Sequence, residues 1–235
     1  MKWFLPFVFI FASKAVFAAP SDTPVLSPDN KKVMEDKSSR EYSVTDDGAW
    51  HFALGGGLSL GHTAFFSEGT VSGSTDKFDA LITFGPAVEL VAEARWMRPY
   101  AWGFTGGLQL GSEAKADKYE IKQGGTTTKG DADAKIQLTT LYGNAVYRWH
   151  WIYLPFGLNV TSVKMTPSSG YTGSIDSKGG IGTQVGVGFL VHPNIALETH
   201  MFINNWKLEG KSGTTTFDYG TGSLFSWKLQ AKYVF

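Results

Sequence analysis

Apolar residues alternate with small or polar residues, with a period of two, along most of the chain after residue 48. In the final segment one face carries Phe225, Trp227, Leu229, Ala231, Tyr233 and Phe235, and the other carries Ser226, Lys228, Gln230 and Lys232. Neighbouring side chains of a β-strand point to opposite faces, so this pattern predicts a strand with one apolar face. Earlier segments follow the same rule at 50–61, 78–90, 100–110, 136–146, 152–160, 181–189 and 195–203. The pattern therefore predicts eight strands.

Each segment also predicts which side chains share the apolar face. In the second segment these are Phe78, Ala80, Ile82, Phe84, Pro86, Val88 and Leu90, and in the fourth they are Ile136, Leu138, Tyr142 and Val146. Two polar residues, Thr140 and Asn144, interrupt the apolar face of the fourth segment. Pro86 has no backbone N–H to donate, so the second strand needs a bulge at this position.

The connections alternate between short turns and long polar stretches. Short turns such as 148–150 and 192–194 join segments two to three, four to five and six to seven. Polar loops are expected at about 62–77, 112–134, 164–178 and 205–220. Short turns on one side and long loops on the other are typical of membrane β-barrels, in which each strand needs about 10 residues to cross the bilayer.

A soluble lipocalin or β-sandwich is the main alternative fold. In those folds the face opposite the apolar one meets water and is rich in charged residues. Here that face carries mostly Gly, Ala, Ser, Thr and Gln, which suit the narrow interior of a small barrel. Tryptophan gathers at the strand ends beside the short turns, at Trp50, Trp96, Trp102, Trp149 and Trp151. Because Trp prefers the membrane interface, this placement predicts an aromatic girdle on the periplasmic side.

The N-terminal residues have a different character. Residues 1–18 have the charged start, apolar stretch and small-residue ending of a cleaved signal peptide. Residues 19–47 are rich in Pro, Ser and charge and predict a disordered periplasmic segment, which leaves 48–235 for the barrel. The chain has no cysteine and a balanced formal charge, which excludes disulfides and Cys-ligated metals and gives no sign of nucleic-acid binding.

With its alternating segments and its Lys232-Tyr-Val-Phe235 ending, the chain resembles the small eight-stranded outer-membrane proteins of the OmpA transmembrane-domain, OmpX and OmpW type. The resemblance implies an all-β, antiparallel, up-and-down transmembrane barrel with four long extracellular loops, in the bacterial outer membrane. It also implies a monomer surrounded by outer-membrane lipid and lipopolysaccharide. The family's barrel-assembly machinery recognises an aromatic ending of this kind, which here corresponds to Trp227, Leu229, Tyr233 and Phe235.

Few charged residues fall on the inward faces. Counting from the periplasmic end places Glu198 level with Lys232 on adjacent strands, and Glu89 level with Lys228. A buried charge without a partner is costly, so we expect two ion pairs in the lumen. His51, His200 and Glu93 are further inward candidates.

Signs of enzyme chemistry are weak. Some small barrels act on lipid A through a His and a Ser close together on the outer rim, but His62 is followed by Thr63 and Phe65-Phe66-Ser67 rather than by a tight His-x-Ser. The Asp131-Ala-Asp133 pair lacks the remainder of a calcium loop. We therefore expect no catalytic residues, no cofactor and no metal.

Two functions remain open. The first is a structural and surface-interaction scaffold that presents mobile loops bearing Phe65, Phe66, Tyr119, Tyr171, Phe217 and Tyr219 to an unidentified extracellular partner. The second is a narrow channel of the OmpW kind for small or apolar solutes. Glycine on the inner faces favours a cavity, whereas the four lumen charges would tend to block it.

Overall fold

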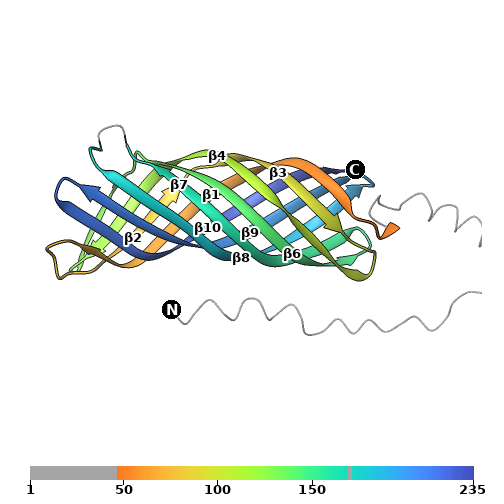
Figure 1. Ribbon diagram of the computed structural model, residues 1–235, viewed down its shortest axis with the longest axis horizontal. Helices are drawn as coiled ribbons and strands as arrows, with labels where there is room; N and C mark the ends of the chain where they lie inside the picture. The colour runs from red at the N-terminus through yellow and green to blue at the C-terminus, as the bar shows by residue number, and fades with distance from the viewer. Residues whose placement is uncertain (1–46, 169–170) are drawn as a thin grey trace, which may run out of the picture. The chain divides into compact units, whose positions relative to one another are not determined.

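The computed structural model describes residues 47–168 and 171–235, which form an antiparallel sheet closed into a ring (Figure 1). Its strands are β1 (His51–Val71), β2 (Phe78–Phe84), β3 (Ala87–Trp96), β4 (Ala101–Gln123), β5 (Thr126–Asp131), β6 (Lys135–Trp149), β7 (Ile152–Thr166), β8 (Ser174–His192), β9 (Ile195–Ser212) and β10 (Thr215–Val234). The predicted signal peptide and all but the last residue of the predicted 19–47 segment lie outside the described residues.

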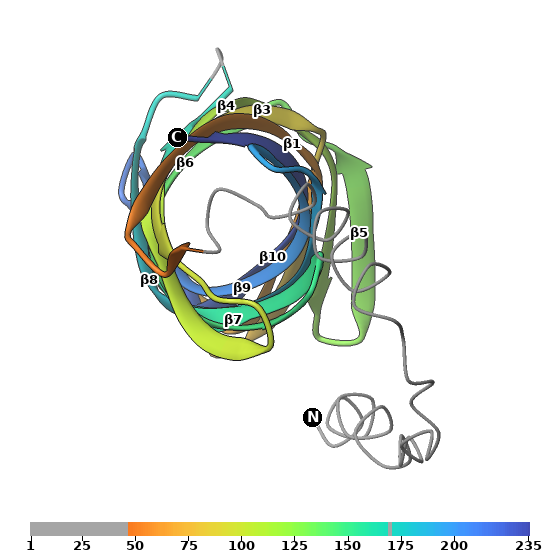
Figure 2. The same cartoon turned by 90° about the vertical axis from the view of Figure 1, so that its right-hand side faces the viewer.

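Pairing of the first strand with the last closes the ring, as the view along the barrel axis shows (Figure 2). Ala53 lies opposite Val234 at one end of this seam, and Val71 lies opposite Phe217 at the other. In addition, Phe235 donates its backbone N–H to the carbonyl of Phe52 at 2.8 Å. The predicted all-β antiparallel barrel is confirmed.

The described residues hold ten strands rather than the predicted eight. The second segment is divided at Gly85 and Pro86, so that β2 and β3 both lie between β1 and β4. Pro86 cannot donate to the sheet, and Gly85 donates instead to the carbonyl of Lys115 at 2.8 Å. The additional strand β5 pairs only with β4 among the described residues and lies beside the ring in Figure 2.

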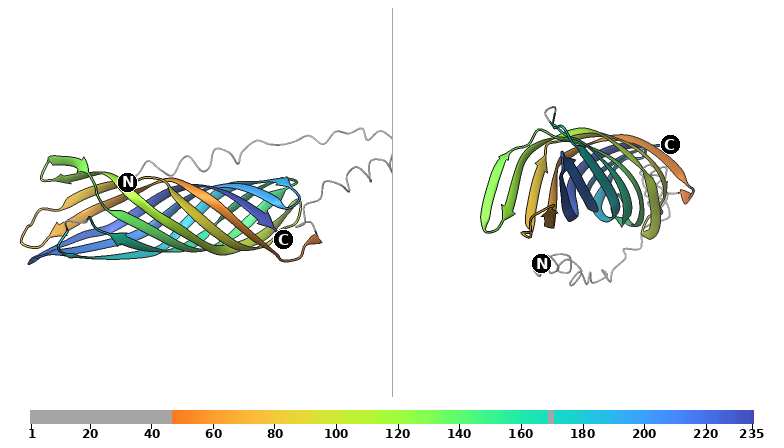
Figure 3. Two further views of the ribbon diagram at one scale, coloured as in Figure 1. Left: turned by 90° about the horizontal axis from the view of Figure 1, so that it is seen from above. Right: turned by 60° about the vertical axis from the view of Figure 1, so that its left-hand side comes forward.

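Among the described residues, strands occupy most of the positions predicted as the four long polar loops. β1 continues to Val71, β4 continues to Gln123, and β9 and β10 are joined by two residues only, 213 and 214. The elongated hairpins at the end of the barrel opposite the C-terminus are clear in Figure 3. The prediction of loops was wrong because polar sequence was equated with loop, whereas paired strands that leave the bilayer have polar outer faces.

The short turns lie where they were predicted. β3 and β4 are joined by residues 97–100, β6 and β7 by 150–151, and β8 and β9 by 193–194. We call this end of the barrel, which also carries Trp50 and Phe235, the turn end, and the opposite end the hairpin end. The described residues contain no helix long and apolar enough to span a membrane.

The break at Gly85 and Pro86 reverses the faces of the second segment. Phe78, Ala80, Ile82 and Phe84 are buried inside the barrel, whereas Val88 and Leu90 are exposed on the outer wall. The prediction that all of them share the lipid face was therefore wrong for β2, because the interruption shifts the alternation by one position.

The fourth segment is also reversed along its whole length. Its predicted lipid-facing residues Ile136, Leu138, Tyr142 and Val146 are buried inside, together with Thr140 and Asn144, while Leu141 is exposed. Around Leu141 the outer face of β6 carries the small residues Thr139, Gly143 and Ala145, which gave little hydrophobic signal, so the larger inward residues were mistaken for the lipid face.

Candidate functional site

The outer wall carries an apolar belt that suits a bilayer. On β9 the belt runs from Ile195 to Ile203, which corresponds to roughly 20 Å of barrel height for a strand tilted by about 40°. Leu90 and Leu158 are 65% and 61% exposed in this belt. Exposing so much contiguous apolar surface would be unfavourable in water.

Exposed tryptophans mark the turn end of the belt. Trp102, Trp149 and Trp151 are 55%, 46% and 52% exposed. Trp102 makes an edge contact with Tyr147, with ring centroids 5.1 Å apart. This is the aromatic row expected at a membrane interface.

The lumen near the turn end is filled by a buried network of charged and phenolic side chains. We call it the Glu93–Glu198 network, and its members are Glu93, Arg95, Tyr142, Tyr153, Glu198, His200 and Lys232. Strands β3, β6, β7, β9 and β10 each contribute at least one of these side chains. All of the members are at most 5% exposed, so the network closes the lumen at this level.

Both carboxylates of the network contact both cations. Arg95 binds Glu93 and reaches Glu198 at 2.8 Å, and Lys232 reaches Glu93 at 2.8 Å and Glu198 at 2.6 Å. Two carboxylates are thus matched by two basic groups, and this pairing offsets the cost of removing four charges from water.

Aromatic residues complete the hydrogen bonding of the carboxylates. Tyr142 donates to Glu93 at 2.6 Å, Tyr153 donates to Glu198, and His200 lies 2.6 Å from Glu198. Inward glycines make room for these rings, because a Cβ at Gly188 would lie 2.1 Å from Tyr153 and one at Gly186 would lie 2.6 Å from His200. The glycine-rich face of β8 therefore accommodates the network and does not leave a cavity.

A second ion pair lies farther from the turn end. The ammonium of Lys228 lies 2.7 Å from Glu89 and donates to the side-chain oxygen of Gln109 at 2.8 Å. It also lies 4.3 Å from the ring centroid of Phe202. The structure thus brings Glu89 to Lys228 and Glu198 to Lys232, and it adds Glu93 and Arg95 as partners of the second pair.

Arg95 is a lumen residue that our sequence reasoning missed. It lies next to Trp96 at the end of β3, where we expected the turn to begin. The alternation of β3 would have found it, because Val88 and Leu90 face outward and the inward series continues through Val91 and Glu93 to Arg95.

His62 was expected in a loop but lies buried in the lumen. Its ring bonds the hydroxyl of Ser59 at 2.8 Å and that of Ser226 at 2.6 Å. Sequence reasoning missed this Ser–His–Ser arrangement because Ser226 is remote in the chain. The three side chains are between 0% and 3% exposed, so no substrate reaches them in this conformation.

His51 lies at the mouth of the turn end. One ring nitrogen lies 2.8 Å from Asp47 and the other lies 3.0 Å from the backbone oxygen of Phe235. The backbone N–H of Ala49 and the His51 ring together lower the pKa of Asp47. These contacts join the start of β1 to the end of β10.

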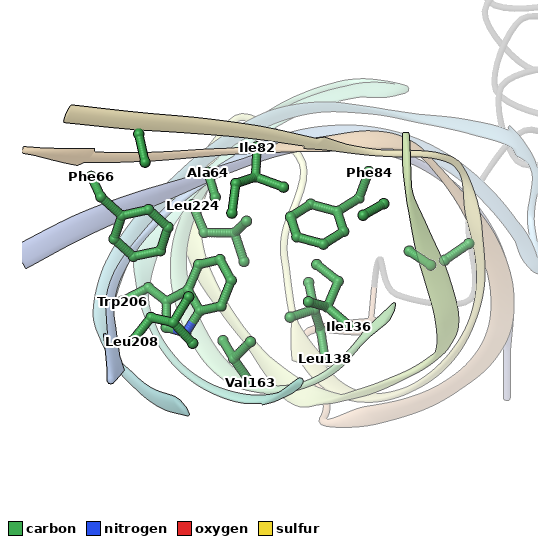
Figure 4. Packing of buried hydrophobic residues seen from close by; sticks show 14 of the residues in the cluster. Ala64, Phe66, Ile82, Phe84, Ile136, Leu138, Val163, Trp206, Leu208 and Leu224 are labelled. Carbon is green, nitrogen blue, oxygen red and sulfur yellow. The ribbon is translucent and has the colours of Figure 1, made fainter. Parts of the chain in front are cut away.

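The hairpin-end half of the lumen is apolar. We call its buried cluster the apolar lumen; it consists of Ala64, Phe66, Phe78, Ala80, Ile82, Phe84, Ala87, Ala114, Ala116, Ile136, Leu138, Val163, Trp206, Leu208 and Leu224. Figure 4 shows most of these side chains converging inside the barrel from opposite walls. Trp206 packs against Phe66 with ring centroids 5.0 Å apart.

The indole N–H of Trp206 has no hydrogen-bond partner among the described residues. Trp206 is 1% exposed, so this donor is buried within apolar surroundings. A buried donor without a partner is costly and is a position at which a guest molecule could offer an acceptor.

Two pockets open next to the apolar lumen at the hairpin end. One, of about 260 Å³, is lined by Ala80, Ile82, Tyr119, Ile121, Ala132 and Tyr219. The other, of about 190 Å³, is lined by Met165, Tyr171, Ile175, Leu208, Glu209, Gly210, Phe217 and Tyr219. Tyr219 belongs to both and packs edge-on against Phe78, with ring centroids 5.3 Å apart.

The aromatic residues expected on exposed loops divide between the two faces of the wall. Phe65 is 47% exposed on the outside, whereas Phe66 is fully buried and Tyr219 is partly buried against the apolar lumen. Phe66 and Tyr219 therefore do not form part of an exposed loop surface, because they belong to inward positions of extended strands.

The predicted assembly signal lies on the outer wall. Trp227, Leu229, Tyr233 and Phe235 are all between 45% and 59% exposed. Their recognition by assembly machinery stays a prediction. Among the described residues, no group of three or more His, Cys, Asp or Glu side chains is placed to hold a metal ion.

No protein-family model and no curated protein matches this chain. The fold is similar to the outer-membrane protein AlkL, with 13% identity, a TM-score of 0.50 and coverage of 92% of this chain and 97% of that one. OprG of Pseudomonas aeruginosa matches with 14% identity, a TM-score of 0.49 and coverage of 82% and 99%. The protease OmpT of Escherichia coli matches with 11% identity, a TM-score of 0.37 and coverage of 79% and 97%.

At these identities the likeness concerns the fold alone. The closed antiparallel ring, the exposed apolar belt and the tryptophan row at one of its edges agree with that likeness. The chain therefore folds as a closed antiparallel β-barrel similar to those of bacterial outer-membrane proteins, and its apolar outer wall suits a bilayer.

Proposed function

We propose that the protein binds small apolar solutes, which it takes up from the hairpin end into the apolar half of its lumen. The observation that carries the proposal is the apolar lumen itself, in which Phe66, Phe84 and Trp206 face the interior of a barrel whose opposite half is polar. Known ligand sites are mostly apolar concavities with a few polar groups, and the mouths of β-barrels are common positions for them.

The two hairpin-end pockets support uptake from that side. Both are lined mainly by apolar and aromatic side chains, and both border residues of the apolar lumen, Ala80 and Ile82 in one and Leu208 in the other. Tyr219 lines both pockets and contacts Phe66, which packs against Trp206, so Tyr219 would need to move aside for a solute to reach Trp206.

The polar half of the lumen supports selectivity against ions. The Glu93–Glu198 network and the Glu89–Lys228 pair fill the route to the turn end with matched charges. Passage of a solute beyond the apolar lumen therefore requires these side chains to move, whereas binding within the apolar lumen needs no continuous aqueous pore.

A surface scaffold is the second candidate function. It is favoured by the β4–β5 hairpin, which lies beside the ring in Figure 2 and leaves β5 paired on one edge only within the described residues. Extended strand edges can pair with a strand of a partner. Neither candidate uses a catalytic residue.

Retention of radiolabelled toluene by nanodiscs tests solute binding. Nanodiscs that contain the protein should retain toluene saturably, above the level of protein-free discs. Ala80→Trp fills the larger pocket and should abolish this excess, whereas Val160→Trp on the outer wall should preserve it. Equal retention by protein-containing and protein-free discs would refute the proposal.

A further inference from the structure

The outer wall carries a shallow depression at the hairpin-end edge of the apolar belt, separate from the two pockets beside the apolar lumen. This depression, of about 280 Å³, crosses β8, β9 and β10 and is lined by Lys178, Gly179, Gly180, Asn205, Trp206, Lys207 and Thr221. A bulge in β8 between Gly179 and Gly182 interrupts its register with β9. Gly179 and Gly180 have no side chains, so the surface is recessed at this point.

Two lysines face each other across this depression. Lys178 and Lys207 are opposite one another in the β8–β9 ladder, and both are exposed on the outer face. Lys164 on β7 is a third exposed lysine nearby, because its neighbours Val163 and Met165 both bond the hydroxyl of Ser177, at 2.6 and 3.2 Å. Three adjacent strands thus concentrate positive charge.

The height of these lysines matches the headgroup layer of a membrane. The outermost exposed apolar residues beneath them are Ile181 on β8 and Ile203 on β9. Lys207 lies four positions beyond Ile203, which corresponds to roughly 10 Å along the barrel axis for a tilted strand. Lysine side chains bend back toward the interface, where lipid phosphates lie within about 8 Å of the hydrocarbon core.

Nearby carboxylates lie on the side away from the membrane. Asp176 pairs with Lys178 at 2.9 Å, and Glu209 lies opposite Asp176 in the ladder, two positions beyond Lys207. Within the described residues, Lys207 has no carboxylate at ion-pair distance. A phosphate that approaches from the bilayer therefore meets the lysines before it meets the carboxylates.

From this arrangement we infer that the β8–β9 depression binds a phosphate group of a lipid A-type glycolipid, with Lys178 and Lys207 contacting the phosphate and the acyl chains lying against Ile181 and Ile203. Lipid A is the source we favour because the site lies at the hairpin end, which corresponds to the extracellular side of outer-membrane barrels. This inference rests on the membrane placement of the barrel and is independent of solute binding in the lumen.

Native mass spectrometry of the full chain in detergent micelles, titrated with bis-phosphorylated lipid A, tests the inference. We expect one lipid A to bind, and Lys178→Gln/Lys207→Gln to weaken its binding roughly 30-fold, as expected for the loss of two lysines at an anionic membrane surface. Lys178→Arg/Lys207→Arg should retain binding. Lys122→Gln/Lys129→Gln removes the same charge from the β4–β5 hairpin and should leave the affinity unchanged.

Different probes separate the possible sources of phosphate. Dephosphorylated lipid A should bind the wild type as weakly as bis-phosphorylated lipid A binds the Gln double variant. The inference is overturned if the two Gln double variants lose affinity equally, if the site variant binds like the wild type, or if phosphatidylglycerol or inorganic phosphate binds as tightly as lipid A. A heat-dependent shift in electrophoretic mobility verifies that each variant is folded.

Discussion

At the scale of single residues, the lumen charges are held by partners from distant parts of the chain. Lys228 on β10 lies between Glu89 of β3 and Gln109 of β4, and all three side chains are about 2% exposed. Removing one partner of such a pair leaves an uncompensated charge where water cannot reach it, which is more damaging than removing both.

The variant Lys228→Met should therefore lower the free energy of unfolding by about 3 kcal/mol. The double variant Glu89→Gln/Lys228→Met should recover most of this loss because no unpaired charge remains. Denaturant unfolding in detergent micelles measures both. A Lys228→Met barrel as stable as the wild type would show that Glu89 and Lys228 do not form a structural pair.

Trp206 supplies a polar group at an otherwise apolar position. If its indole N–H binds an acceptor on the solute, Trp206→Phe should weaken binding of cyclohexanone about fivefold, the equivalent of one lost hydrogen bond of about 1 kcal/mol. Methylcyclohexane has no acceptor and should bind both proteins equally. An equal effect on the two solutes would assign Trp206 a packing role only.

At the scale of strands, alternation predicted most of the outer wall, but it could not locate the interruptions. The C-terminal segment, the third and the fifth have the predicted apolar residues outside, with Trp227, Leu108 and Leu158 all exposed. In β2 the same rule placed Phe84 outside, because the shift at Gly85 and Pro86 depends on how β1 and β4 pair around it. A period-two pattern fixes relative faces within a strand, and tertiary pairing decides which of them faces inward.

The candidate site was predictable only in part for the same reason. Counting heights from the turn end placed Glu89 beside Lys228 and Glu198 beside Lys232, which is how the side chains lie. The apolar lumen was not anticipated, because the large apolar residues of β2 and β6 were assigned to lipid. The contact between Ser226 and His62 depends on the bulge in β1 between Ser59 and Gly61, which the sequence does not reveal.

The reversed faces of β2 predict different effects for two single lysine substitutions. Phe84→Lys places an unpaired charge in the apolar lumen and should cost about 3 kcal/mol of stability. Leu81→Lys lies on the outer face and should cost at most about 1 kcal/mol, as expected near an interface. Chemical denaturation would rank the stabilities of the two variants. The opposite order would mean that Phe84 faces lipid, as an uninterrupted second strand would require.

At the scale of the whole molecule, the barrel has two halves of different chemistry. The turn-end half is filled with matched charges, and the hairpin-end half is apolar with pockets at its mouth. This division explains why lumen charges and a ligand cavity, which compete for space in one narrow barrel, can coexist at different heights.

Because side chains fill the lumen at two heights, we predict that the protein does not conduct ions. In a planar bilayer the refolded protein should show no regular openings, and Glu89→Gln/Lys228→Met should also stay closed because the Glu93–Glu198 network remains. Regular openings of the wild type would indicate a continuous water-filled path and would contradict the blocked turn end.

The most direct test of apolar solute binding is a methyl NMR titration of the isoleucine-labelled protein in nanodiscs with cyclohexanone. Ile82 and Ile136 lie in the apolar lumen, whereas Ile181 and Ile203 face lipid and report only partitioning into the bilayer. We predict saturable shifts at Ile82 and Ile136 and a linear, unsaturated drift at Ile181 and Ile203. The same linear drift at all four methyl groups would mean that the lumen binds no apolar solute.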